Sequence, residues 1–138
     1  MGVLKMSKIQ IVIDTIAGFV GAVLGFLYGD LNGIFYALLA FMIIDYVTGV
    51  IIAIINKCLS SETGFKGIVK KLLILVFVAL GHIIDTYIIG GTPVTMTAVM
   101  LFYCANEGIS ILENAVVLGL PIPKKLKDIL EQIKSKGE

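Results

Sequence analysis

Residues 106–123, NEGISILENAVVLGLPIP, decide how this sequence is interpreted, because they place charged and amide side chains within an apolar helix. On an α-helix, residues four and seven positions apart lie on the same face. The polar residues of this segment follow that spacing or lie beside it: Asn106, Glu107, Ser110, Glu113 and Asn114. One side of the helix therefore needs a polar partner or water. The rest of the chain indicates which class of protein would supply it.

The composition indicates an integral membrane protein. The chain has 138 residues, of which 58% are hydrophobic, and its mean hydropathy is +1.02. A small soluble fold has too much surface for its volume to bury so large an apolar fraction. The net charge of +1 gives no indication of a nucleic-acid partner. The two cysteines, Cys58 and Cys104, lie far apart and lack the spacing of a metal site.

Four apolar segments are each long enough to cross a bilayer, which takes about 20 helical residues. We predict one membrane domain over residues 1–138, with spans at residues 9–28, 34–55, 67–89 and 94–120. The tail, residues 121–138, begins with two prolines and then has apolar residues at helical spacing, so we predict an amphipathic helix on the membrane surface. The predicted fold class is an all-α integral membrane protein with four transmembrane helices and a C-terminal amphipathic surface helix.

The lysines predict the orientation of the chain. All 11 basic residues are lysines, and they lie at the N-terminal end, in or beside the second connection, and in the tail. Four spans put all of them on one side, which satisfies the positive-inside rule and makes both termini cytoplasmic. A three-span alternative, with residues 94–120 as a re-entrant or surface segment, would break that rule. We expect these lysines at the membrane interface: Lys70, Lys71, Lys124, Lys125 and Lys127.

Small residues on the first two spans indicate close helix packing. Gly21, Gly25 and Gly29 are four residues apart, and Asp14 lies seven residues before Gly21 on the same face. Such spacing lets two helix backbones approach closely in lipid. Tolerance of small residues in lipid is the alternative interpretation. We expect oligomerisation or helix packing at six positions: Asp14, Gly21, Gly25, Gly29, Asp45 and Gly49.

Ionisable groups inside membrane spans normally face a bundle interior or a water-filled cavity. For the polar residues of 106–123, two interpretations stay open: they line the hydrated lumen of an oligomer, or they make polar contacts between helices. His82 and Asp85 supply too few ligands for a metal site. No nucleophile, base and orienting residue occur together as a set. We therefore expect no metal, no cofactor and no enzymatic activity.

Four stretches, in this order, give the chain a resemblance to a known family. They are DYVTG at 45–49, the serines, glycines and lysines of 60–71, EGISILEN at 107–114, and GLPIPKKL at 119–126. With them, the chain from about residue 38 to 133 resembles the phage lysis and toxin-secretion holins, typified by the clostridial toxin-release holin. The resemblance implies a non-enzymatic protein that homo-oligomerises in the cytoplasmic membrane and forms lesions. Endolysin or a toxin would be released through them.

Holins often have two start codons, which give a lytic form and an inhibitor that differ by an N-terminal lysine. Met1 and Met6 lie on either side of Lys5, which fits that device. The sequence is also compatible with two alternatives to a holin. One is a small ion or solute channel or transporter, and the other is a passive subunit of a membrane complex.

Overall fold

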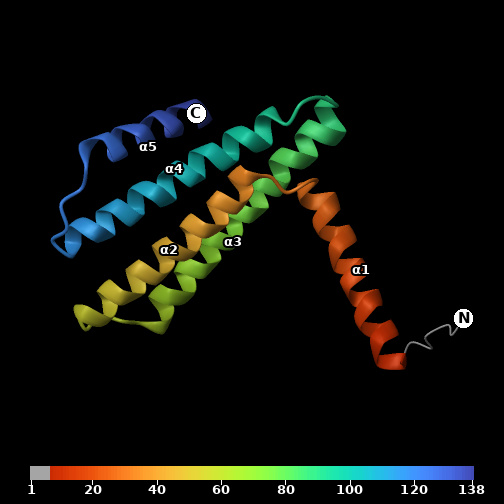
Figure 1. Ribbon diagram of the computed structural model, residues 1–138, viewed down its shortest axis with the longest axis horizontal. Helices are drawn as coiled ribbons and strands as arrows, with labels where there is room; N and C mark the ends of the chain where they lie inside the picture. The colour runs from red at the N-terminus through yellow and green to blue at the C-terminus, as the bar shows by residue number, and fades with distance from the viewer. Residues whose placement is uncertain (1–6) are drawn as a thin grey trace, which may run out of the picture.

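The computed structural model describes residues 7–138, and within that range it is helical and has no strand (Figure 1). Four of its helices are long and apolar enough to cross a membrane, which confirms the predicted all-α class with four candidate spans. The residues of the two-start hypothesis, Met1, Lys5 and Met6, lie outside the described range. The helical elements are α1 (Lys8–Tyr28), α2 (Gly33–Ile55), α3 (Ser61–Ile83), the π-helical turn η1 (Ile84–Ile89), α4 (Val94–Val117) and α5 (Lys124–Gly137).

Two helix boundaries differ from the predicted spans by more than one residue. The third helix begins at Ser61, six residues before the predicted start at Gly67. The Ser60 hydroxyl oxygen accepts a hydrogen bond from the Thr63 backbone N–H at 3.2 Å, and this N-cap starts the helix early. The fourth helix ends at Val117 rather than at residue 120, and Gly119 follows with a φ of +80°. Glycine adopts this left-handed conformation without the steric cost of a Cβ.

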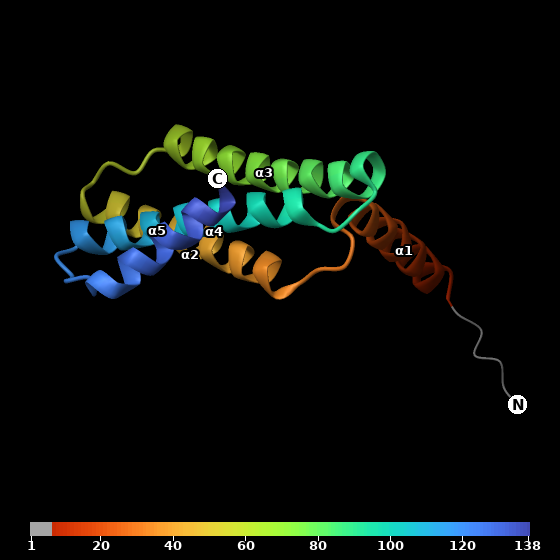
Figure 2. The same cartoon turned by 90° about the horizontal axis from the view of Figure 1, so that it is seen from above.

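Helices α2, α3 and α4 pack side by side, and α5 lies on the far side of α4 (Figures 1 and 2). Their shared core is apolar and lies nearer to the η1–α4 end of the bundle. The α1–α2 turn and the η1–α4 turn lie at one end of the bundle of α2, α3 and α4, and the other two connections lie at its opposite end (Figure 1). The buried core residues are Phe35, Leu38, Met42, Ile74, Val78, Met96 and Met100.

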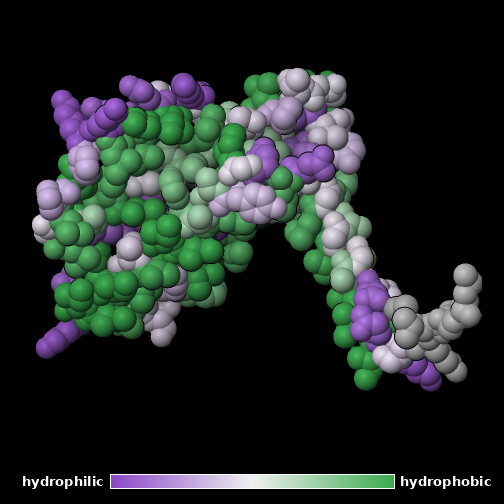
Figure 3. Space-filling view, viewed as in Figure 1, coloured by the Kyte–Doolittle hydropathy of each residue, from purple (hydrophilic) through white to green (hydrophobic). Residues whose placement is uncertain are grey.

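Helix α1 projects away from this bundle and has no buried residue (Figure 1). It is held only near its C-terminal end, where the Tyr28 hydroxyl donates a hydrogen bond to the Leu75 carbonyl at 3.2 Å. Beside it, Gly29 has a φ of +61°, and a Cβ there would lie 2.6 Å from the His82 ring. Hydrophobic residues cover most of the visible exterior, whereas hydrophilic residues follow the edge formed by α5 (Figure 3).

The backbones of α3 and α4 come closest at Gly81, where a Cβ would lie 2.8 Å from the Met96 Cα. Because backbone atoms cannot move aside as a flexible side chain can, we expect Gly81→Ala to lower the free energy of unfolding by about 1–3 kcal/mol. Titration with a denaturing detergent in micelles measures this change. Gly18→Ala is the matched control, since a Cβ at Gly18 would contact nothing within 4 Å. Equal stability of the two variants would contradict the expectation.

Candidate functional site

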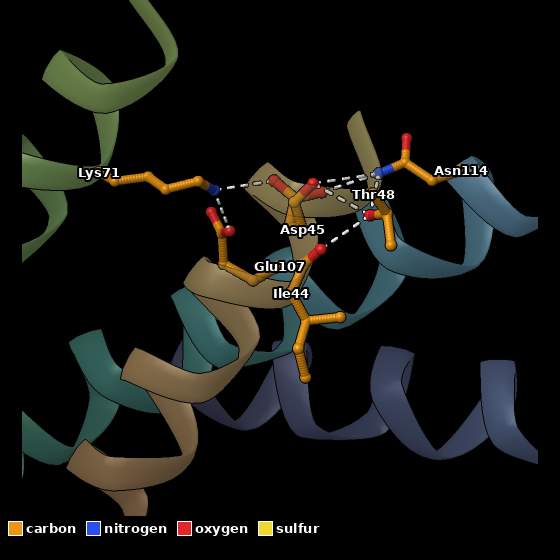
Figure 4. A network of polar contacts seen from close by, with 6 residues as sticks. All are labelled: Ile44, Asp45, Thr48, Lys71, Glu107 and Asn114. Atoms are coloured by element: carbon orange, nitrogen blue, oxygen red, sulfur yellow. Dashed lines mark hydrogen bonds and ion pairs between the residues drawn. The ribbon is translucent and has the colours of Figure 1, made fainter. Parts of the chain in front are cut away.

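An ion-pair network joins the three packed helices inside the bundle. The Lys71 ammonium on α3 donates to Asp45 Oδ2 on α2 at 2.8 Å and to Glu107 Oε2 on α4 at 2.5 Å (Figure 4). The three side chains are 16%, 17% and 11% exposed, respectively. One cation therefore holds two carboxylates from two different helices, and all three groups are largely removed from solvent.

A second set of hydrogen bonds extends the network along α2 and α4. The Asn114 amide donates to Asp45 Oδ1 at 3.2 Å and to Thr48 Oγ1 at 2.9 Å (Figure 4). The Thr48 hydroxyl in turn donates to the Ile44 carbonyl at 2.9 Å, which leaves its oxygen free to accept from Asn114. Asp45 is thus held by both Lys71 and Asn114. This agrees with polar contacts between helices, one of the two interpretations that the sequence left open.

The structure adds an ion-pair role to Lys71, which the sequence placed among the interface lysines. Because α3 begins at Ser61, Lys71 lies ten residues into the helix, about 15 Å along it at 1.5 Å per residue. Its ammonium is directed at the two carboxylates of α2 and α4.

An open cavity of about 430 Å³ borders the network. Its lining comes from α2, the α2–α3 connection, α3 and α4, and it includes Lys70, Ser110 and Gly49. Such a space is large enough for several water molecules, and its polar groups provide hydrogen-bond partners for them. The cavity therefore gives the ion pairs a polar boundary on the side of the α2–α3 connection.

The polar residues of 106–123 divide between two sides of α4. Glu107, Ser110 and Asn114 face the network or the cavity beside it. Glu113 is exposed instead and lines a separate cavity of about 200 Å³ together with Lys127 of α5. Asn106 is half-buried. The predicted stripe is therefore not one continuous surface.

Of the packing positions predicted on the first span, Gly29 meets His82 of α3, whereas Gly21 and Gly25 meet no other helix within residues 7–138. A Cβ placed at Gly21 or Gly25 would contact nothing within 4 Å there, and the same holds for Gly49 on α2. Asp14 is exposed and accepts a hydrogen bond from the Gln10 side chain of its own helix at 2.9 Å. Close packing at Gly21 and Gly25 therefore remains a prediction about contacts between copies of the chain.

Asp85 has a structural role that sequence reasoning missed. Its side chain is only 2% exposed and accepts hydrogen bonds from the backbone N–H groups of Thr95 at 3.0 Å and Met96 at 2.8 Å. Pro93 precedes α4 and supplies no side-chain cap, so Asp85 of η1 caps this helix from a distance. Its neighbour His82 packs instead against Gly29. The sequence contained one signal for this role: Pro93, at the start of α4, has no side-chain group that can accept a hydrogen bond from the first N–H groups of the helix.

Comparison of the sequence with known proteins identifies its family. Residues 22–135 match the family model described as the bacteriophage holin family. The chain belongs to that holin family. A probable holin of Bacillus phage phi105 is 41% identical over 101 residues, which cover 73% of this chain and 74% of the phage protein. The resemblance noted in the sequence is thereby confirmed at the level of the family.

Other relatives of this holin-family chain are uncharacterised bacterial proteins. One from Listeria innocua is 45% identical over 115 residues, covering 83% of this chain and 81% of the relative. Another, from Clostridium perfringens, is 39% identical over 132 residues, covering 96% and 98% respectively. No solved structure matches the chain.

Proposed function

We propose that this chain is a non-enzymatic holin that homo-oligomerises in the cytoplasmic membrane and opens lesions through which endolysin or a toxin is released. Lysis or secretion follows from that release. The family match and the probable holin of phage phi105 support the class of activity. The four long apolar helices support a multi-pass location in the membrane.

The exposed surface of α1 is the observation that supports homo-oligomerisation. This helix has no buried residue, and Tyr28 near its C-terminal end attaches it to the bundle. Gly21 and Gly25 are therefore accessible to a partner helix. Asp14, on the seventh residue of the helix, is costly to leave facing lipid. A second copy of the chain would supply a helix that packs against Gly21 and Gly25 and a polar group that contacts the Asp14 carboxylate.

In the resting membrane, the lysines set the orientation, with both termini in the cytoplasm. In this state α5 is undocked from α4 and lies on the inner membrane surface, with Lys124, Lys125 and Lys127 near anionic headgroups. Within each subunit, Glu107 and Asn114 hold α4 against α2 and α3. Lumen lining by Glu107 would require separation from Lys71, so its role in the resting state is to hold the bundle together.

Expression of this chain alone in a bacterial culture tests the proposal. We expect the release of a large cytosolic enzyme into the periplasm or medium after a delay, because a holin lesion passes folded proteins. Enzyme activity outside the cytoplasm and potassium efflux are measured in parallel. Efflux of small solutes without release of the enzyme would indicate a channel or transporter, and the absence of both would indicate a passive subunit.

The double variant Gly21→Leu/Gly25→Leu tests the α1 contact in the same culture. We expect loss of enzyme release at unchanged membrane abundance, since leucine side chains keep two helix backbones apart. Val20→Leu, on an apolar position of the same helix, is the matched control. Normal release by the double variant would exclude the glycine face as the contact between copies.

A further inference from the structure

Helix α5 folds back along α4 and runs in the opposite direction (Figures 1 and 2). Its middle lies at the middle of α4, where a Cβ at Gly108 would be 2.9 Å from the Leu130 side chain. Its end lies near the start of α4, where a Cβ at Gly137 would be 2.6 Å from the Phe102 backbone N. The two helices therefore share most of the length of one candidate membrane span.

The two faces of α5 differ sharply in polarity. Leu130 is only 7% exposed and faces α4, and the Lys134 ammonium lies 5.6 Å from the centre of the Phe102 ring. The outer face carries exposed charged side chains, and in the part of the chain that is described none of them forms an ion pair. These exposed residues are Lys124, Lys125, Asp128, Glu131 and Lys136.

Lipid cannot cover this outer face while α4 spans the membrane. A charged side chain at the centre of a membrane helix costs about 2.5–3.5 kcal/mol on insertion scales. Several unpaired charges along one face multiply that cost, and snorkelling relieves only those near the helix ends. The docked position of α5 is therefore compatible with a spanning α4 only where water covers the charged face.

We propose that α5, docked on α4, forms the water-facing wall of the lesion. This inference rests on the holin function proposed above and names the surface that lines its lumen. The apolar face of α5 attaches to α4, and the charged face meets the aqueous lumen between copies of the chain. The 14 residues of α5 span about 21 Å at 1.5 Å per residue, most of a hydrocarbon core of about 30 Å.

The segment between the two helices permits a change of position. It contains Gly119, which has a φ of +80°, and the prolines Pro121 and Pro123. These residues interrupt the helix, so α4 and α5 are not one continuous helix. In the resting membrane α5 lies on the cytoplasmic surface, and when the lesion opens it turns about this segment onto α4. Glu107, which is already paired with Lys71, is not needed in the wall.

A disulfide between α4 and α5 tests this wall. We place Phe102→Cys and Gly137→Cys in a Cys58→Ala/Cys104→Ala background, because the Gly137 Cβ position is 2.8 Å from the Phe102 Cβ. That separation is shorter than the roughly 3.5–4.5 Å of disulfides, so the last turn of α5 has to move outward by about 1 Å when the two cysteines join. The protein is inserted into phosphatidylethanolamine–phosphatidylglycerol vesicles that contain a fluorescent dextran of protein size.

We expect the disulfide to form and the oxidised protein to release dextran at least as fast as the same protein after reduction. Release only after reduction would overturn the proposal, because α5 would then be a cover that has to leave α4. Failure of the disulfide to form in leaking vesicles would also overturn it. No release from the cysteine-free protein without the lock would instead overturn the holin function itself, and the wall with it.

A second variant examines the charged face directly. With the disulfide formed, we expect Asp128→Leu/Glu131→Leu to lower dextran release, because the middle of the α5 outer face becomes apolar and holds water less well there. Glu62→Leu is the control, since this exposed carboxylate lies in the first turn of α3, away from α5. Undiminished release by the double variant would contradict the proposal even if the lock leaves release intact.

Discussion

Replacement of Lys71 by methionine is expected to lower the free energy of unfolding by about 3–5 kcal/mol, the range found when one partner of a buried ion pair is removed. Methionine keeps most of the length of the side chain but removes the ammonium. Asp45 and Glu107 would then lie close together, both largely buried and without their cation. Titration of the purified protein with a denaturing detergent in micelles, followed by circular dichroism, measures the change.

Two further variants separate this effect from a general loss of charge. Lys70→Met is the matched control, because Lys70 lines the same cavity but forms no ion pair within residues 7–138. The triple variant Asp45→Asn/Lys71→Met/Glu107→Gln removes all three charges, and we expect it to recover most of the lost stability. A loss below about 1 kcal/mol for Lys71→Met, as for an exposed pair, would show that the network is not buried in the folded protein.

Removal of the Asp85 side chain is the second large expected effect. Asp85→Ala leaves the backbone N–H groups of Thr95 and Met96 without acceptors in a buried place. Each unsatisfied buried donor costs about 1–3 kcal/mol, so we expect a loss of about 2–4 kcal/mol in the free energy of unfolding. Hydrogen exchange of the Thr95 and Met96 amides is expected to become faster, because α4 loses its cap.

Asp85→Asn and Asp30→Ala provide the comparison. Asparagine keeps one carbonyl oxygen as an acceptor, so we expect an intermediate loss. Asp30 is an exposed carboxylate in the α1–α2 turn at the same end of the molecule, and its replacement is expected to change stability little. Equal amide exchange in Asp85→Ala and the unsubstituted protein would rule out a capping role.

The apolar spans were predictable because hydropathy and length alone distinguish a helix that crosses a membrane. The role of Lys71 was not predictable in the same way. The sequence 61–66, SETGFK, is polar and contains glycine, so the predicted span began at Gly67 and left Lys71 near its edge. The Ser60 cap extends α3 by six residues, so the same lysine lies well inside a helix that packs against α4, where it meets two carboxylates.

The roles of Asp85 and α5 depended on tertiary contacts that periodicity does not contain. The spacing of His82 and Asp85, three residues apart, predicts neighbouring side chains on one helix face. A π-helical turn begins at Ile84, however, and the two side chains meet different neighbours. The amphipathic pattern of α5 predicted a helix with one apolar face. Such a pattern does not distinguish lipid from another helix as the partner of that face.

The ion pairs also impose an order on biogenesis. Asp45 lies on α2 and Lys71 on α3, and only a short connection separates these consecutive helices. Either helix inserted by itself would carry an isolated charge into the bilayer, whereas a hairpin of the two enters with the charges already matched. Glu107 is synthesised later and joins a lysine that is already in place. We therefore expect α2 and α3 to enter the membrane as one hairpin and α4 to pack onto that hairpin afterwards.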